Sequence, residues 1–218
     1  MIEITGNDVN INNVWQVGMG GPEGKVCLSN EAREKMLVSR KYLMNRVENG
    51  EIIYGVNTGF GALSNVTIDS RDLEKLQINI IRSHSAGVGN LFSPEQTRAI
   101  MYLRANALAR GHSGIRPLVI EKIIEYLNAD VLPAIPQQGS VGASGDLAPL
   151  AHLALGLIGE GRCWFEENIV PIGEVLAKKN LIPLKLQARR IITDKWLSSY
   201  DGRWVIKLQK SAKLIKAC

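Results

Sequence analysis

A glycine-rich run in the second half of the chain constrains its structure and chemistry more than any other feature. The run reads Gly-Ser-Val-Gly-Ala-Ser-Gly-Asp-Leu-Ala-Pro-Leu and covers residues 139–150. Its centre is Ala143-Ser144-Gly145, a tripeptide without bulky side chains. Glycine reaches backbone angles closed to other residues, so the chain can fold back until an amide nitrogen approaches a nearby carbonyl carbon. The run therefore predicts a tripeptide that can cyclise into an electrophilic group.

Further motifs precede this run in a fixed order. They are Tyr-Gly-Val-Asn-Thr-Gly-Phe-Gly at 54–61, Ser-His-Ser-Ala-Gly-Val-Gly at 83–89, Arg-Ala-Asn-Ala-Leu-Ala at 104–109 and Gly-His-Ser-Gly at 111–114. Together with the run they resemble the aromatic amino acid ammonia-lyases, most closely those that act on histidine. An isolated Ala-Ser-Gly would carry almost no information, whereas long motifs in family order are specific. The likeness covers roughly residues 1–188.

The resemblance implies a mainly α fold with short extended pieces. We expect residues 1–188 to form the N-terminal domain of the fumarase/aspartase-like superfamily, with the cyclisable run inside it. In the family, a C-terminal helix bundle follows this domain, drives assembly into homotetramers and supplies further substrate-binding groups. We expect that bundle to be absent from this chain.

The resemblance also implies the chemistry of the run. In the family, an Ala-Ser-Gly tripeptide cyclises with loss of two waters to 4-methylideneimidazole-5-one, abbreviated MIO. The resemblance implies that Ala143, Ser144 and Gly145 do so here. The substrate amine attacks this group, which makes a poor leaving group a good one. We expect no metal and no nucleotide, because the three histidines are too scattered for a zinc signature and the run lacks the lysine of a phosphate-binding loop.

Tyr54 corresponds to the family's general base, which removes a β-proton from the substrate, and Gly61 in the same motif corresponds to a substrate-binding position. Free tyrosine has a pKa of about 10, so a base of this kind needs a neighbour that favours the phenolate. The glycines around it suggest a loop that closes over the substrate. The alternative is a tyrosine at an ordinary turn, capped by Asn57 and Thr58.

Ser83 and His84 correspond to the positions that select the substrate. Relatives that use phenylalanine have an aromatic and an aliphatic residue there, and those that use tyrosine have histidine and leucine. An imidazole in the pocket wall can pair with a substrate imidazole, so the sequence favours deamination of L-histidine to urocanate and ammonia. Phenylalanine or tyrosine deamination and the related aminomutase reactions remain alternatives, and a purely structural His84 is a further one.

Local signals give the expected elements. Each expected helix begins at a capping residue or a proline, namely Ser29, Asp69, Ser93, Pro117 and Asp146. The helix after Ser93 carries a capping box, and the apolar helix after Asp146 contains His152, which we expect to be buried and hydrogen-bonded. Glu51–Ile53 and Ile169–Val170 are expected to be short extended pieces.

Charge separates the last thirty residues from the rest. Residues 189–218 hold eight Lys and Arg against two Asp and Glu, whereas the remainder of the chain has a net charge of −1. The basic character therefore belongs to the tail alone. The tail has no recognisable binding fold, so we expect no nucleic-acid partner, although its interleaved aromatic and basic residues make an anchor for nucleic acid a minor alternative.

The remaining composition indicates an ordinary cytoplasmic protein. The N-terminus has no signal sequence, and no apolar run is long enough to cross a bilayer. Three widely spaced cysteines indicate reduced thiols. We therefore expect no membrane partner, and the family resemblance implies a small-molecule amino acid substrate.

The resemblance ends abruptly at Ala188, where relatives continue with an acidic-glycine pair and an Asn-Gly segment. Ordinary codons for residues 189–204, read one base later, spell Glu-Gly-Leu-Ser-Leu-Ile-Asn-Gly-Tyr-His-His-Met-Thr-Gly-Val-Gly. This string resembles the missing continuation. We therefore expect residues 189–218 to be an out-of-frame tail and the isolated chain to be inactive. A non-catalytic remnant that partners an intact subunit is the rival interpretation.

Overall fold

The structure is a computed structural model and describes residues 1–7, 9–54, 56–58, 72–139, 141–142 and 145–186. Helices dominate it, as the sequence predicts, and they are α1 (Ile11–Met19), α2 (Asn30–Glu48), α3 (Leu73–His84), α4 (Pro94–Ala109), α5 (Pro117–Asn128), α6 (Ala148–Leu157) and α7 (Ile172–Lys178). The strands are short, and they are β1 (Ile2–Ile4), β2 (Val26–Leu28), β3 (Val88–Leu91), β4 (Leu132–Pro133), β5 (Pro136–Gln138), β6 (Val141–Gly142), β7 (Gly145–Asp146), β8 (Arg162–Phe165) and β9 (Asn168–Pro171).

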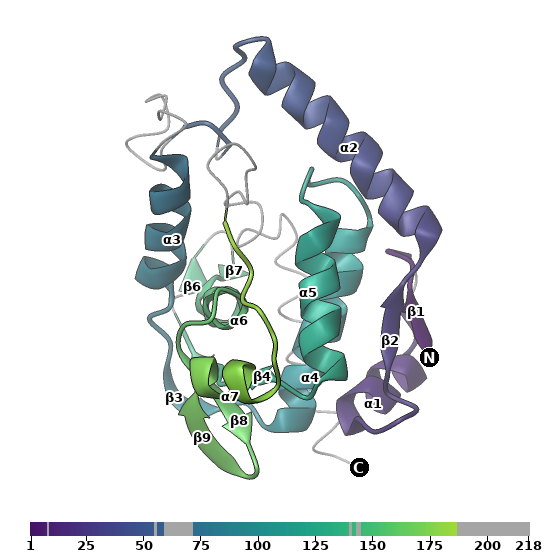
Figure 1. Cartoon of the computed structure of the whole chain (residues 1–218), viewed down its shortest axis with the longest axis vertical. Coiled ribbons are helices and arrows are strands. Elements are labelled where there is room, and N and C mark those ends of the chain that lie inside the picture. The colour runs from purple at the N-terminus through teal and green to yellow at the C-terminus, as the bar shows by residue number, and fades with distance from the viewer. Residues whose placement is uncertain (8, 55, 59–71, 140, 143–144, 187–218) are drawn as a thin grey trace.

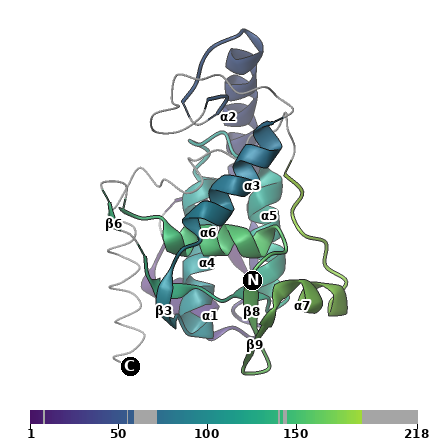
Figure 2. The ribbon, with the colours of Figure 1, turned by 90° about the vertical axis from the view of Figure 1, so that its left-hand side faces the viewer.

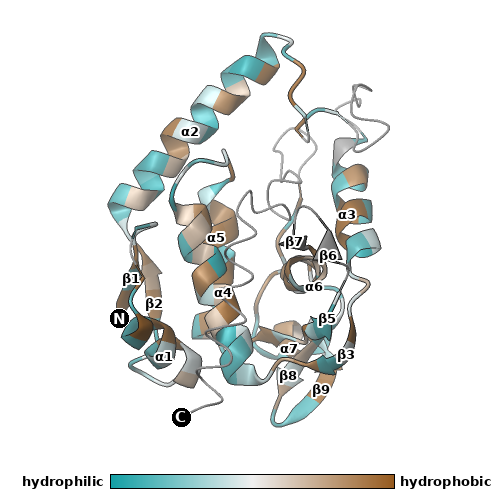
Figure 3. Cartoon of the chain, turned by 180° about the vertical axis from the view of Figure 1, so that it is seen from behind, coloured by the Kyte–Doolittle hydropathy of each residue, from teal (hydrophilic) through white to brown (hydrophobic). Residues whose placement is uncertain are grey.

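Helix α4 lies at the centre of the fold (Figure 1). Most of its residues are buried on every side, including Tyr102, Arg104 and Asn106. A helix that is covered all round belongs in the core rather than at a surface. Helices α1 and α5 pack against α4. In Figure 3 much of the ribbon of α4, α5 and α6 is brown, the colour of hydrophobic residues.

The short strands pair in small separate sheets around these helices. Strand β1 pairs with β2 in parallel, whereas β3 with β5, β6 with β7, and β4 with β8 and β9 are antiparallel. Strand β9 contains Ile169 and Val170, which confirms the expected extended piece there. Residues 51–53 are not a strand, because their backbone groups are used in a turn.

Several expected helix starts are confirmed by their hydrogen bonds. The Ser29 hydroxyl accepts from the amide of Ala32, and Ser93 forms the complete capping box with Gln96. Pro117 opens α5. The expected cap at Asp69 lies outside the described residues.

The expected cap at Asp146 is wrong. The N-cap of α6 is Leu147, which makes no side-chain capping bond, because Asp146 instead pairs with Val141 in the hairpin that precedes the helix. Of the described helices, none has both the length and the apolar character that a membrane crossing requires.

Candidate functional site

The glycine-rich run forms a tight hairpin. Gly142 in β6 lies opposite Gly145 in β7, and Val141 lies opposite Asp146. The connection between the paired strands consists of Ala143 and Ser144, which lie outside the described residues. The pairing brings the backbone on either side of these two residues together. A pair of glycines flanking two small residues fits a group that is built by joining backbone atoms within the tripeptide.

Two elements hold this hairpin in the fold. Strand β5 leads into it and helix α6 leads out of it. Strand β5 pairs with β3, with Val88 opposite Gln138 and Leu91 opposite Pro136. The side-chain amide of Gln137 adds a bond by donating to the carbonyl of Leu91 at 2.9 Å. The run is therefore anchored to a segment that lies more than forty residues earlier in the chain.

Ser83 and His84 lie at the C-terminal end of α3, which crosses α6 (Figure 2). The Ser83 hydroxyl donates to the carbonyl of Ile80 at 3.0 Å. Nδ1 of His84 lies 2.9 Å from the same carbonyl and 3.1 Å from the Ser83 oxygen. Because a carbonyl only accepts, this bond assigns the proton to Nδ1. In the neutral ring Nε2 is then the acceptor, which is the chemistry needed to receive an N–H from a substrate.

Gly87 joins the same segment to α6. Its amide donates to Nε2 of His152 at 3.1 Å. A Cβ at position 87 would lie 3.1 Å from that nitrogen and 3.1 Å from Cβ of Pro136, so the fit is tight. Burial lowers the pKa of His152 below its ordinary value of 6.5, which favours the neutral ring that can accept this bond. The expected hydrogen-bonded state of His152 is confirmed, although the ring is only half-buried.

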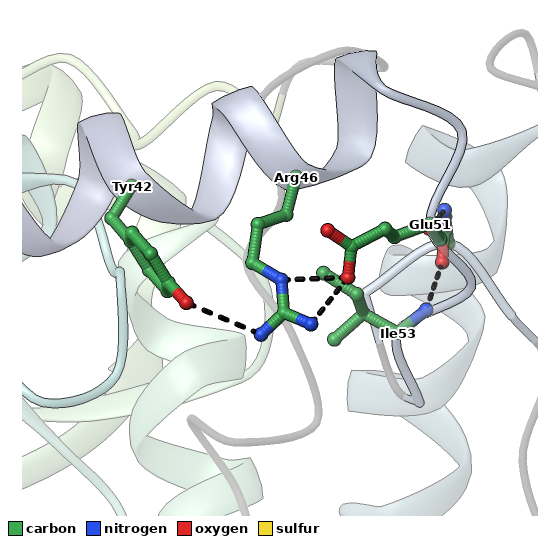
Figure 4. Close-up of polar contacts among 5 residues, drawn as sticks. Tyr42, Arg46, Glu51 and Ile53 are labelled. Carbon is green, nitrogen blue, oxygen red and sulfur yellow. Dashed lines mark hydrogen bonds and ion pairs between the residues drawn. The ribbon is translucent and has the colours of Figure 1, made fainter.

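Tyr54 lies on a turn that follows α2. Asn57 fastens this turn from within, since its carbonyl oxygen accepts from the amide of Ile53 at 2.8 Å and its amino group donates to the carbonyl of Glu51 at 2.8 Å. Outside the turn, Arg46 of α2 reaches the Glu51 carboxylate, with Tyr42 beside it (Figure 4). The Tyr54 side chain is 54% exposed. A turn at Tyr54, which the sequence offered as the alternative to a catalytic loop, is thus present. The two hydrogen bonds of Asn57 hold it together.

The structure therefore connects some of the predicted residues through the elements that carry them. Ser83 and His84 are tied to the hairpin of Gly145 through β3, β5 and α6. Tyr54 comes from a separate turn, and Gly61, Ala143 and Ser144 lie outside the described residues. Within the part of the chain that the structure describes, no three His, Cys, Asp or Glu side chains gather where a metal could be held.

Replacing Asn57 by alanine is expected to loosen the turn that carries Tyr54. Two hydrogen bonds are lost, which corresponds to a cost of about 1–2 kcal/mol in the free energy of opening the turn. Limited proteolysis of the 218-residue chain should show faster cleavage within residues 51–58. Asn45→Ala is the matched control, because Asn45 is exposed on α2. Equal cleavage rates for the two variants would contradict the claim that the Asn57 side chain stabilises this turn.

Comparison with known proteins gives a consistent result. A sequence profile described as aromatic amino acid lyase matches residues 9–192. A histidine ammonia-lyase from Geobacillus sp. strain WCH70 is 46% identical over 189 residues, which are 87% of this chain and 37% of that relative. The chain thus spans little more than a third of the length of the curated relatives it matches.

Solved structures agree with this result. A histidine ammonia-lyase from Trypanosoma cruzi superposes with a TM-score of 0.77 at 36% identity, over 87% of this chain and 36% of that one. A tyrosine aminomutase from Streptomyces globisporus gives a TM-score of 0.78 at 38% identity, over 87% and 36% of the two chains. The same fold therefore occurs in proteins named for different reactions.

Proposed function

The chain belongs to the aromatic amino acid lyase family, and from this premise we propose that it carries the electrophile-forming part of an enzyme that converts L-histidine to urocanate and ammonia. The observation that carries the proposal is the attachment of Ser83–Gly89 to the hairpin of the cyclisable tripeptide, through β3 and β5. From that attachment we infer that the imidazole-bearing segment lies close to the place where an electrophile would form.

The tripeptide Ala143-Ser144-Gly145 would provide MIO, which supplies an electrophilic carbon for the substrate amine. Gly142, just before the tripeptide, pairs with Gly145, its last residue, so the backbone around Ala143 and Ser144 is held in register. Tyr54 takes the β-proton of the substrate, and it lies on a turn that Asn57 holds together. Gly61 forms part of the substrate-binding pocket, as the family motif at 54–61 implies.

His84 provides the basis for choosing histidine as the substrate. With its proton on Nδ1, the ring offers Nε2 as an acceptor, and Ser83 completes the pair. A site that pairs with a substrate N–H rejects analogues that lack it, because its own polar group is then left unpaired. The aminomutase reaction is the second candidate, since a tyrosine aminomutase is among the similar solved structures.

We further propose that the family domain is residues 1–188 and that residues 189–218 are translated out of frame. The family match ends at residue 192, close to the point where the charge of the chain changes sign. Sequencing the DNA from codon 180 onwards tests this directly. Codons that do not spell the family continuation when read one base later would refute the shifted frame.

The activity test uses two proteins, the 218-residue chain and a version in which one base is deleted near codon 188. The frame-restored protein is expected to form urocanate and ammonia from histidine. The 218-residue chain alone is expected to form neither, because the relatives that it matches are more than twice as long. Urocanate production by the short chain would contradict its inactivity, and a β-amino acid product from the long one would favour the aminomutase reaction.

Assembly and location are proposed on the same basis. The family resemblance implies a cytoplasmic homotetramer, in which residues from several subunits complete each active site. Sedimentation of the frame-restored protein would give its mass. A monomer with full activity would contradict the tetramer.

A further inference from the structure

The segment between α3 and β3 has a side-chain anchor that the proposed chemistry does not use. At one end, the amide of Ser85 donates to the carbonyl of Ile81 at 3.1 Å and closes α3. At the other end, β3 begins at Val88 and pairs with β5. Between these ends the amide of Gly87 donates to His152. The imidazole of His152 thus accepts a hydrogen bond from a backbone amide that lies between α3 and β3, where neither element provides an acceptor for it.

The position of His152 makes this bond a link between two motifs. His152 lies in the second turn of α6, the helix that leaves the tripeptide hairpin. Gly87 lies three residues after His84, the last residue of α3. The two residues are 65 positions apart in the sequence. Their hydrogen bond therefore fixes the Ser83–Gly89 segment against α6, the helix that follows the tripeptide hairpin.

We propose that His152 is a positioning residue, which holds the substrate-selecting segment Ser83–Gly89 in register with the tripeptide hairpin by accepting the Gly87 amide on Nε2. This inference rests on the proposed function for the meaning of the segment, although the bond itself does not. His152 touches no reacting atom in this role. It sets where His84 stands relative to the hairpin.

Protonation of His152 removes the acceptor, so the link is expected to depend on pH. The pKa of the folded ring lies below 6.5, so the fold favours the neutral form. The contribution of the ring to stability is therefore complete above pH 6.5 and is lost as the pH falls through the lowered pKa. The elements packed against α6 bring few other ionisable groups, since β4 and β5 have none and α3 carries Glu74, Lys75, Arg82 and His84.

Two of those α3 groups already have partners. Arg82 forms a two-pronged ion pair with Glu160, just beyond α6, at 2.6 and 2.8 Å. The Nδ1 atom of His84 is bonded to the carbonyl of Ile80. The hydrogen bond to Arg82 lowers the pKa of Glu160 below its ordinary value of 4.5, so the carboxylate of that pair stays ionised at pH 5 and above.

Two substitutions of His152 distinguish the effect of the hydrogen bond from the effect of side-chain packing. The amide oxygen of glutamine reaches about as far as Nε2 of histidine, whereas that of asparagine reaches only as far as Nδ1. His152→Gln therefore keeps an acceptor for Gly87 that cannot be protonated, and His152→Asn places its acceptor too far back. His112→Asn is the control, because His112 lies exposed in the turn after α4.

The experiment measures hydrogen exchange of backbone amides in the 218-residue chain, as protection relative to the intrinsic rate at each pH. The Gly87 amide is compared with that of Ile123, in the buried face of α5. At pH 7.5, His152→Asn should lower the protection of Gly87 relative to Ile123 by roughly threefold to tenfold, as the loss of one hydrogen bond predicts. His152→Gln and His112→Asn should retain it.

The pH profile gives the second measurement. In the unsubstituted chain the relative protection of Gly87 should fall as the pH is lowered from 7.5 to 5, and in His152→Gln it should stay level. Unchanged protection in His152→Asn, an equal loss at Gly87 and Ile123, or a falling profile in His152→Gln would each overturn the proposal. None of these results depends on lyase activity, so failure of the proposed function leaves the result on His152 intact.

Discussion

Replacing Ser144 by alanine is expected to abolish ammonia release by the frame-restored protein. The serine would lose its hydroxyl to become the carbon that the substrate amine attacks, and alanine has no hydroxyl to lose. Without an electrophile the amine remains a poor leaving group, so kcat should fall by at least about a thousandfold, or about 4 kcal/mol in the activation free energy. Urocanate formation from L-histidine measures the effect.

The control for this experiment is Ser39→Ala, because Ser39 lies on α2, away from the hairpin. It should deaminate histidine at the unsubstituted rate. Circular dichroism of both variants checks that they are equally folded. Normal turnover by the Ser144→Ala variant would refute the tripeptide chemistry, and with it the proposed function.

The largest effect on stability is expected for Gly6→Ala. Gly6 has a φ of +77°, and a Cβ there would lie 2.6 Å from backbone atoms of Ala109 and Arg110. The clash is with backbone in the central helix region, which cannot move aside as a flexible side chain can. The amide of Gly6 also donates to the side chain of Asn106 at 3.0 Å. We expect a loss of about 3–5 kcal/mol in the free energy of unfolding.

Gly50→Ala isolates the backbone part of that cost. Gly50 has a φ of +81°, yet no atom lies within 4 Å of the position that a Cβ would take. Its substitution should cost only about 1–2 kcal/mol, which is the strain of a left-handed backbone alone. Urea unfolding of the 218-residue chain compares the two variants. Equal losses would mean that the contact with α4 contributes nothing.

Local signals predicted the parts of the fold that local interactions determine. Ser93 and Gln96 are three residues apart and satisfy each other's backbone partners, so the start of α4 is set within one turn. Ser29 caps α2 by a similarly local hydrogen bond, and Pro117 favours the start of α5 because its ring fixes a helical φ. These predictions held because no distant residue competes for the same groups.

Predictions failed where distant partners decide the conformation. Asp146 has the chemistry of a cap, but its backbone pairs with Val141 and α6 starts one residue later. Helix α1, whose N-cap Asn10 accepts from Asn13, was not predicted at all, since its apolar residues matter only once they meet α4. Strand β8 was missed as well, because it is defined by pairing with β4 and β9.

The candidate site divides in the same way. The tripeptide, Tyr54 and the Ser83-His84 pair could be found from motifs, because each motif is contiguous in the sequence. The bond from Gly87 to His152 could not, because its partners are 65 residues apart and no motif contains both of them. The sequence indicated only that His152 would find some partner within its apolar helix.

The hydrogen bond between the Gly6 amide and the Asn106 side chain has a consequence for how the protein is made. Its two partners are separated by 100 positions, and Asn106 also donates to the carbonyl of Asn7. A ribosome adds residues at roughly 5–20 per second. Gly6 and Asn7 must therefore wait several seconds after their own synthesis for the helix that fastens them, and once outside the exit tunnel they are exposed to proteases and chaperones until it forms.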